Sequence, residues 1–571
     1  MRPILGAMVV AAAAMTLCRN DAAAQNPVRT LDIGGPPGES QQRCYSDSML
    51  TAALAIYNGP AAVRVFGDLP VAADVKISGD VGVYRGSVRV DGRIDGRLVV
   101  LDGDARITAT GVVTGDVIVL GGRLTVDPAA STGRRSQCDQ PVALDHAPAG
   151  TLSVQPAKRP LTRLTSDIAI SVGDARVAPH VGIGTYNRIE AAPLQLGATA
   201  EWAPMVNDSL HLDGYGIFRT ARDPSGSRPA VGWYLDGAWT HRGSLPFTLR
   251  AAGGSRIEAT ADRPGSALES SLSALFLRRD HRDWLLWRGV RLSAEIRPTA
   301  ELGISAGVES SRQTTVLAVD AFSLFRGTET WRPNPLIDDG RYRILSAGVR
   351  WDARNANRHP VLSWYLAAQI RRTSSNDISP VSLPTIIRDS IPTTGYGSTD
   401  GDFDLRGYFR LDPVQRLVAR ISAAGYLGGD PLTIQNRHSA GGPDPLIGYD
   451  FRAINCERRR KADPALPALC DREMAIQVEY RRQLPLRFTS RLGGYNIGIH
   501  NPELVVLGDA ASAWLAGDSA GRVPGGRIQA IGEWQSEFGV GISTPHLGLY
   551  LAKSLVLSSG VRFQIVFGHR F

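Results

Sequence analysis

Beyond its first two dozen residues, this 571-residue sequence has no long hydrophobic run. No later stretch approaches the ~18 consecutive apolar residues that a membrane-spanning helix requires. Charge of one sign is also scarce, because 63 Lys and Arg are set against 55 Asp and Glu, and the arginines are dispersed. These absences exclude a helical membrane protein and argue against a nucleic-acid partner, which needs clustered basic and aromatic residues.

The amino terminus, in contrast, carries a secretory pattern. Arg2 supplies a positive charge, an apolar run covers residues 4–17, and three alanines at 22–24 form a small-residue cleavage site before Gln25. Residues 1–24 are therefore predicted to be a signal peptide. The mature protein is expected to be exported.

Histidine and cysteine are rare, and neither is spaced as metal ligands are. We therefore predict no metal site. Four cysteines remain after Cys18, and an even number in an exported chain favours disulfides, with three possible connectivities. We favour the pairs Cys44–Cys138 and Cys456–Cys470, because each brackets one local unit, and free buried thiols are the alternative.

Residues 63–126 contain a short internal repeat. Three copies begin at Gly79, Gly96 and Gly115, offset by 17 and 19 residues, and a second set of glycines corresponds at Gly86, Gly103 and Gly122. Small aliphatic residues alternate between Gly-Asp or Gly-Arg corners, a pattern that favours a coil in which each rung pairs with the next. Residues 25–138 are therefore predicted to form a β-solenoid, with an antiparallel sandwich as the alternative. Residues 48–57 are predicted to be a short helix or a capping strand.

These rungs resemble the bactofilin-like polymer-forming scaffolds, a right-handed β-helix family without enzymatic activity. The resemblance implies a rigid rod with open ends that stack on a partner or on another copy. Four prolines, at 141, 148, 156 and 160, mark residues 139–166 as a linker.

Residues 167–571 follow an alternating pattern without a convincing amphipathic helix. About sixteen segments of roughly ten residues alternate apolar and polar positions, which predicts a transmembrane antiparallel β-barrel. Clear examples are residues 210–220, 231–241, 344–354, 361–372, 403–413, 417–427 and 474–485. The longest joins are expected at 312–343, 373–402, 429–473 and 516–535. The predicted fold class is thus all-β, a short solenoid followed by a barrel of about 16 strands.

The last eleven residues, 561–571, alternate as one strand and end on an aromatic residue, Phe571. Only Val566 and His569 break the pattern. This ending resembles the closing strand of bacterial outer-membrane barrels, in which the terminal aromatic residue is the barrel signal.

The loop at residues 438–452 contains Gly441-Gly442 and then Ile447-Gly448-Tyr449. It resembles the inward-folded loop of the bacterial surface antigen family, the BamA/TamA-like barrels, and the strands around Glu479 and Asp509 resemble the family's next two strands in order. The family's loop tip carries an arginine that enters the barrel lumen and pairs with acidic residues, at positions that correspond to Glu479 and Asp509.

Two residues depart from the family pattern: the tip arginine is Ile447, and a glycine expected after Asp509 is Ala511. Glu479 and Asp509 then need another partner, for which Arg452 and Arg481 are candidates, or else both face water. The family's small periplasmic α/β domains are also missing, and the solenoid stands in their place.

Enzyme motifs are weak in this sequence. Ser519 lies in a Gly-x-Ser-x-Gly pattern, but Pro524 and two glycines follow it where a nucleophile elbow needs a helix. Asp400, Asp402 and Asp404 resemble the start of a calcium loop, but the sixth and twelfth positions are both leucine, so we expect an acidic external loop instead. We predict no enzyme and no cofactor.

These patterns together predict a protein of the bacterial outer membrane with its solenoid in the periplasm. The expected role is protein assembly, translocation or a conduit with a docking solenoid, and the alternative is a structural anchor. Expected partners are membrane lipid and lipopolysaccharide. Periplasmic proteins, peptidoglycan or another copy of the chain are candidate partners of the solenoid.

Overall fold

The structure is a computed structural model. It describes residues 47–138, 142, 144–146, 152–154, 163–165, 170–172, 175–205, 207–260, 267–299, 301–325, 329–354, 362–412, 414–456, 466–484, 486–492, 495–500, 502–544, 547–556, 560–567 and 570–571. The predicted signal peptide and Cys44 lie outside these residues. The chain divides into two compact units, one within residues 36–158 and one that holds a large antiparallel sheet, and each is described by itself.

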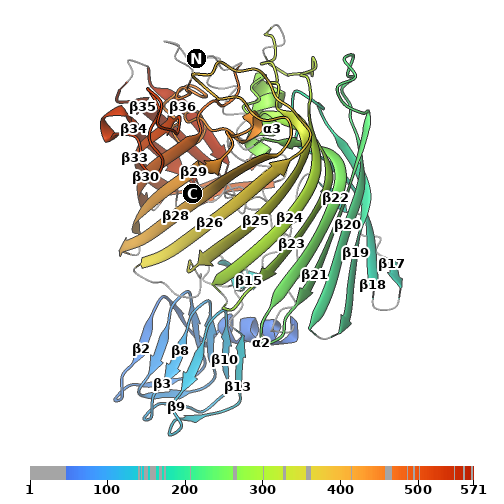
Figure 1. The fold of residues 1–571 in the computed structure, drawn as a ribbon. Helices are drawn as coiled ribbons and strands as arrows, with labels where there is room; N and C mark the ends of the chain where they lie inside the picture. The colour runs from blue at the N-terminus through green and yellow to red at the C-terminus, as the bar shows by residue number, and fades with distance from the viewer. Residues whose placement is uncertain are drawn as a thin grey trace. The chain divides into compact units, whose positions relative to one another are not determined.

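The first unit is a parallel β-solenoid, shown in blue in Figure 1. Its three sheets each stack one strand per turn. The first sheet contains β1 (Val63–Phe66), β4 (Val81–Tyr84), β7 (Leu98–Leu101), β10 (Val117–Leu120) and β13 (Arg135–Cys138). The second contains β2 (Leu69–Val71), β5 (Val88–Val90), β8 (Ala105–Ile107) and β11 (Leu124–Val126). The third contains β3 (Lys76–Ser78), β6 (Arg93–Asp95), β9 (Val112–Val113) and β12 (Ser131–Thr132).

The register of these strands matches the sequence repeat. Val81 lies beside Leu98, and Leu98 lies beside Val117, at the predicted offsets of 17 and 19 residues. All of these pairings are parallel, so the solenoid is confirmed and the sandwich is wrong. The interior is a stack of fully buried aliphatic side chains, among them Val83, Val100 and Val119.

The corners between rungs explain the Gly-Asp and Gly-Arg pattern. The Asp80 carboxylate accepts the backbone N–H of Arg97 one turn further on, at 2.8 Å, and also binds its guanidinium. Asp116 accepts the N–H of Arg134 in the same way, at 3.1 Å. The guanidinium of Arg97 lowers the pKa of Asp80, which keeps the corner charged and hydrogen-bonded.

One helix covers the outer face of the first sheet. Helix α2 (Asp47–Tyr57) buries Ile56 and Tyr57 against Tyr84 and Leu101, so it lies along the side of the coil. Of the two sequence predictions, the helix is therefore correct and the capping strand is wrong. Part of the predicted linker is also structured, because β14 (Leu144–His146) and β15 (Leu152–Val154) form an antiparallel hairpin.

The second unit is built around one large antiparallel sheet, in which the strands follow one another in chain order (Figure 1). Of its 19 described strands, sixteen have six or more residues, in agreement with the predicted number. These are β18 (Ala175–Ile183), β19 (Leu194–Met205), β20 (Asp208–Phe218), β21 (Val231–His241), β22 (Phe247–Ala259), β23 (Trp284–Ile296), β24 (Leu302–Thr315), β25 (Asp339–Asp352), β26 (Leu362–Ser375), β28 (Tyr396–Asp412), β29 (Gln415–Gly429), β30 (Arg472–Gln483), β33 (Glu503–Trp514), β34 (Gln535–Ser543), β35 (Leu547–Ser554) and β36 (Arg562–Phe567). The shorter members are β16 (Arg163–Thr165), β17 (Ile170–Val172) and β27 (Ile378–Ser379).

Long connections alternate with short ones, and the long ones agree with the sequence prediction. Four long connections join strands at one rim of the sheet, here called the long-loop rim. They cover residues 316–338, 376–395, 430–471 and 515–534, close to the four ranges expected. At the other rim, the connections are short: residues 242–246 join β21 to β22, and residues 297–301 join β23 to β24. Two 3₁₀ turns lie in the long connections, η1 (Ile434–Asn436) and η2 (Ile531–Glu533).

Two elements of this unit, a helix and a β-hairpin, were not predicted from the sequence. Helix α3 (Ala267–Leu277) lies between β22 and β23, although no helix was expected in this half of the chain. Its leucines at 268, 272 and 275 are spaced for one helical face, a signal that the strand pattern on both sides concealed. A hairpin of β31 (Arg487–Leu492) and β32 (Tyr495–His500) also forms a separate two-stranded sheet between β30 and β33.

The sheet is strongly curved. Glu269 on α3 accepts a hydrogen bond from the side chain of Gln564 on β36 at 2.8 Å, although many strands separate them in the sheet. Arg452, in the connection after β29, likewise reaches Asp283 just before β23. Both contacts bring together elements that are far apart in the strand order of the sheet.

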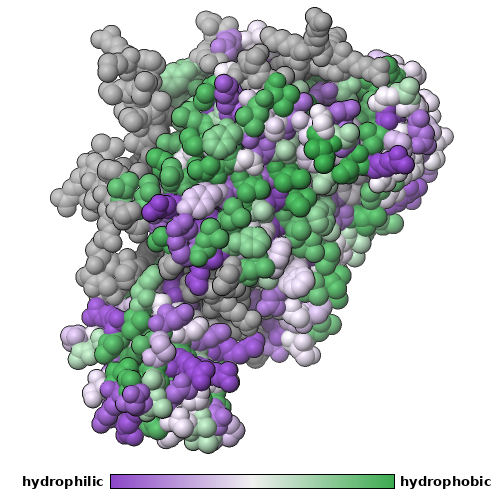
Figure 2. Space-filling view, turned by 90° about the vertical axis from the view of Figure 1, so that its left-hand side faces the viewer, coloured by the Kyte–Doolittle hydropathy of each residue, from purple (hydrophilic) through white to green (hydrophobic). Residues whose placement is uncertain are grey.

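The two faces of the sheet differ in chemistry. Each of the sixteen long strands carries at least one large apolar side chain that is exposed on the outer face, and Figure 2 shows broad apolar patches on one side. Examples, one from each strand, are Val181, Leu196, Leu212, Trp233, Leu249, Val290, Val308, Leu345, Trp364, Phe403, Leu427, Ile476, Leu504, Phe538, Leu551 and Phe563. The inner face instead holds buried, ion-paired Arg, Asp and Glu. An apolar exterior around a polar interior reverses the usual arrangement of a water-soluble protein.

Candidate functional site: the inward loop and its charged wall

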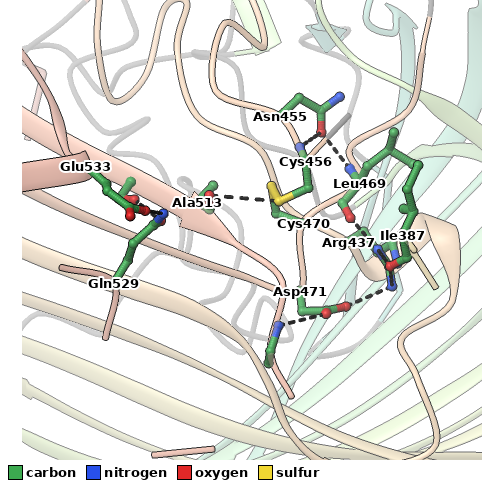
Figure 3. Close-up of a disulfide and its surroundings, with 12 residues drawn as sticks. Ile387, Arg437, Asn455, Cys456, Leu469, Cys470, Asp471, Ala513, Gln529 and Glu533 are labelled. Carbon is green, nitrogen blue, oxygen red and sulfur yellow. Dashed lines mark hydrogen bonds and ion pairs between the residues drawn. A yellow bond between two sulfur atoms is a disulfide. The ribbon is translucent and has the colours of Figure 1, made fainter. Parts of the chain in front are cut away.

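The connection of residues 430–471, here called the inward loop, is fastened at its base by a disulfide (Figure 3). Cys456 and Cys470 are bonded, as predicted, and the side chain of Asn455 accepts the N–H groups of Cys456 and Leu469 beside them. Two isolated β-bridges hold the two arms of the loop together. His438 exchanges backbone hydrogen bonds with Cys470, and Ala440 does so with Ile454. Cys138 is also disulfide-bonded, and its predicted partner Cys44 lies outside the described residues.

Arg437 anchors the same base to the neighbouring strand ends. Its guanidinium is 2.8 Å from the carboxylate of Asp471 and donates to the carbonyls of Leu469 and Ile387 (Figure 3). Asp471 in turn accepts the N–H of Ala516 at 3.0 Å. Burial lowers the pKa of Arg437 to about 10, so the side chain remains charged and paired at neutral pH.

The tip of the loop is held by a carboxylate on the wall. Glu537 on β34 accepts the backbone N–H groups of Ile447 at 3.0 Å and of Gly448 at 2.6 Å. A Cβ atom at Gly448 would lie 2.9 Å from that carboxylate, so glycine lets the tip approach closely. Gly441 and Gly442 have φ angles of 102° and 103°, a backbone conformation that residues other than glycine rarely adopt.

The departure at Ile447 has a structural explanation. Its side chain is buried in an apolar seat on the inner face, formed by Val505, Leu507, Tyr550, Ala552 and Val566. Val566 is one of the two positions that break the alternation of the last strand. Val566, the apolar residue that breaks the alternation of the strand, therefore packs with Ile447, the apolar residue at the loop tip. The hydroxyl of Tyr449 donates to the carbonyl of Ser536 at 2.9 Å and fixes the loop beyond the tip.

Glu479 and Asp509 both lie on the inner face, and both are buried and ion-paired. Arg481 donates to Glu479 at 2.7 Å. Arg570, the penultimate residue of the chain, lies 3.1 Å from Glu479 and 2.6 Å from Asp509. Its guanidinium also donates to the carbonyl of Pro445 in the inward loop at 3.3 Å.

The other candidate partner, Arg452, lies elsewhere. It binds Asp283, which also pairs with Arg188 and Arg332, and all of these groups belong to the connections at the long-loop rim. Burial alone would raise the pKa of Asp283, but the three guanidinium groups hold it well below its usual range. Arg452 therefore ties the loop base to the start of β23 and does not neutralise Glu479 or Asp509.

The predicted closing strand is shorter in the structure. The strand β36 covers Arg562–Phe567, whereas Arg570 and Phe571 do not belong to it. Phe571 is 2% exposed, and the guanidinium of Arg481 lies 6.0 Å from its ring centroid. The expectation of an eleven-residue strand is therefore wrong, because the buried charges of the wall bind the end of the chain.

The sequence motifs that resemble enzyme or metal sites lie in two different places in the structure. Asp400 and Asp402 lie within β28 and bind Arg371 on the inner face, so the expected acidic external loop is wrong. Ser519 lies on an exposed bend. The described residues contain no cluster of His, Cys, Asp or Glu suited to a metal ion. Among the described helices, none has the length and apolar composition to span a membrane.

Reduction of the Cys456–Cys470 disulfide is expected to loosen the base of the loop. The bond closes a segment of 14 residues, for which restriction of the unfolded chain stabilises by about 3 kcal/mol. The Cys456→Ser, Cys470→Ser variant should show faster hydrogen exchange in residues 438–456 than the wild type. Exchange in β18–β22, far along the sheet, is the internal control and should not change. Equal exchange throughout would contradict a structural role for the bond.

Acidification is expected to weaken the loop base through His281. Burial, assisted by the charge of Arg332, lowers the pKa of this histidine to about 4, and its ring lies 5.0 Å from that of Phe451. An unfolded histidine titrates near ~6.5, so the unfolded state binds the proton first and stability is lost as the pH falls from ~6.5 towards 4. The charged groups that face it are Arg188, Arg279, Arg332 and Asp280.

The measurement is the exchange rate of residues 441–452 at several pH values between 7.5 and 4.5, corrected for intrinsic exchange. Protection should fall below pH ~6.5 in the wild type. A His281→Phe variant should show a flatter profile, because it removes the group that charges. An identical profile in both proteins would assign the pH dependence to other groups.

Comparison with known proteins gives distant structural likenesses. No protein-family model matches the chain, and no curated protein matches it. Among solved structures, BamA from Haemophilus ducreyi lacking POTRA domains 1–3 is 14% identical, with a TM-score of 0.39 over 71% of this chain and 73% of that one. CdiB from Escherichia coli is 9% identical, with a TM-score of 0.30 over 75% and 66%. OccK11 (OpdR) from Pseudomonas aeruginosa is 10% identical, with a TM-score of 0.26 over 69% and 86%. BamA, whose family the sequence resembles, is among the structures to which this chain is similar.

Proposed function

We propose that the large sheet is an outer-membrane β-barrel of the surface antigen type, and that it is a conduit gated by the inward loop. The observation that carries the proposal is the loop tip seated on the inner wall, with Glu537 bound to the N–H groups of Ile447 and Gly448. The apolar exterior of all sixteen long strands supports the membrane location, since lipid tolerates such surface and water does not. The role served is the assembly or translocation of polypeptides, with the solenoid as a periplasmic docking module.

The test is conductance of the full-length protein in planar lipid bilayers. Glu537→Ala removes the acceptor that holds the tip, so we expect open events that are larger or more frequent than in the wild type. Glu533→Ala is the matched control, because Glu533 lies four residues away in η2 and its side chain is exposed. Silence of the wild type and of Glu537→Ala, with both inserted in the membrane, would reject the conduit.

A second candidate is a structural anchor, in which the solenoid self-associates. One observation favours it: equivalent corners alternate in charge along the coil, as Asp80, Arg97, Asp116 and Arg134. In a second copy stacked on the last rung, the first rung carries Ala62 at this corner and the next rung carries Asp80, so Arg134 would meet that carboxylate across one rung. Sedimentation of the full-length protein in detergent should then show concentration-dependent oligomers that Arg134→Glu weakens. A single monomeric species at every concentration would reject this role.

A further inference from the structure

We propose that Arg570 is the positioning residue that seats the inward loop, because it supplies from the carboxy terminus the positive charge that the loop tip lacks. This inference concerns the position of the loop and does not depend on the conduit. It assigns a role to Arg570, which the sequence alone did not single out.

Three acidic side chains lie close together on the inner face of the sheet, here called the wall, where the loop tip is seated. Glu479, Asp509 and Glu537 project from β30, β33 and β34, which are successive neighbours in the sheet, and each is at most 4% exposed. Asp509 and Glu537 occupy directly paired positions of their strands. Carboxylates so close and so buried repel one another unless cations compensate them. Buried positive charge therefore stabilises this arrangement.

Two arginines meet that need, and their roles differ. Arg481 lies two residues from Glu479 on the same strand and pairs with it. Arg570 pairs with Glu479 and with Asp509, and among the described residues it is the only cation within ion-pair distance of Asp509. Its own side chain is 4% exposed, so this pairing is shielded from water. Without Arg570, the carboxylate of Asp509 would face Glu537 uncompensated.

The same guanidinium also touches the loop. Arg570 donates to the carbonyl of Pro445, and the side chain of Gln477 donates to that same oxygen at 3.0 Å. Two residues further along the loop, Ile447 and Gly448 bind Glu537. Arg570 thus contacts the loop directly and also compensates the acidic wall that holds the tip.

Withdrawal of the loop from its seat leaves the charges of the inner face paired. Because Ile447 is apolar, withdrawal of the tip removes no cation from the wall, and Arg570 continues to compensate Glu479 and Asp509. The loop then gives up hydrogen bonds and apolar contacts but leaves no uncompensated charge behind. Displacement of Arg570, in contrast, would release the loop and the end of the last strand in one event.

The test compares hydrogen exchange in residues 441–452 of the full-length protein in nanodiscs. Arg570→Gln should raise exchange there by about tenfold or more, as expected when a buried pair loses one partner. Arg562→Gln is the matched control: Arg562 also joins β36 to the loop, through Asp450, but that pair is exposed and should contribute little. Equal effects of the two substitutions would overturn the proposal.

A second variant moves the charge from the terminus to the tip. In the Arg570→Gln background, Ile447→Arg places a guanidinium next to Glu537 and Asp509 and should restore protection of the loop. In the wild-type background the same Ile447→Arg change should lower protection, because it buries an additional cation in an apolar seat. If Arg570→Gln disturbs the whole sheet, recovery in the double variant still supports the proposal. Failure to recover overturns it.

Discussion

Asp338→Ala is expected to destabilise the long-loop rim by about 3–5 kcal/mol, the cost of breaking a buried ion pair by removing one partner. Asp338 is fully buried before β25, and Arg388 binds its carboxylate through two nitrogens. The substitution would leave the guanidinium of Arg388, which is 4% exposed, buried without its charge partner. Such a group costs more than the lost hydrogen bonds alone.

Asp338 also joins three connections that are far apart in the sequence. Its carboxylate accepts the N–H of Val381 at 2.7 Å and the N–H of Ile434 in η1 at 2.8 Å. Ile434 lies near the start of the inward loop, so the loss should spread from the rim to the loop base. We expect cleavage by added protease within residues 376–395 and 430–456 under conditions in which the wild type is intact.

The matched control is Asp377→Ala. Asp377 pairs with Arg341 at 3.7 Å at the same rim, but both side chains are more than 60% exposed. An exposed pair of this kind contributes between zero and about 1 kcal/mol. Asp338→Asn, which retains an oxygen acceptor but removes the charge, should fall between the two. A protease pattern for Asp338→Ala that matches Asp377→Ala would show that the carboxylate is not the centre of the rim.

Local patterns predicted much of this fold because they act over a few residues. The glycine corners at 86, 103 and 122 recur wherever the coil turns, and the segment 231–241 alternates as a strand and is one. The loop glycines 441, 442 and 448 were recognisable for a similar reason. Each meets a demand of the backbone or of a close approach that only glycine satisfies.

The partners of the loop were not predictable in this way. Glu537 and Arg570 meet the loop only because the sheet curves, and nothing near either residue in the sequence indicates that contact. The last strand shows most clearly that local patterns do not predict contacts between residues far apart in the sequence. Its alternation predicts continuation to Phe571, but buried carboxylates from two other strands attract Arg570 and end the strand early. The lapse at Val566 was the available signal, and it marked an inward-facing contact with Ile447.

Gly103→Val should disrupt the solenoid more than any surface substitution in it. A Cβ atom at Gly103 would lie 1.9 Å from the carbonyl oxygen of Gly86 in the preceding turn, and a backbone atom cannot move aside as a side chain can. The turns must then separate at this corner, which breaks the parallel pairing of β5 with β8 and exposes buried Val88 and Ala105. Overpacking of a core typically costs about 1–3 kcal/mol, and we expect a larger loss here because a backbone oxygen occupies the space.

Hydrogen exchange of the full-length protein resolves this loss by segment. Protection should collapse in β5, β8 and their neighbours, whereas β19–β24 of the large sheet should exchange as in the wild type. Ala109→Val is the matched control, because Ala109 is exposed at another corner of the same coil and has room for the added methyl groups. A small effect of Gly103→Val, comparable with that of Ala109→Val, would mean that the turns do not stack as closely as this corner requires. A large effect confined to the solenoid would show that tight glycine corners, repeated once per turn, are what allow so short a coil to bury its aliphatic core.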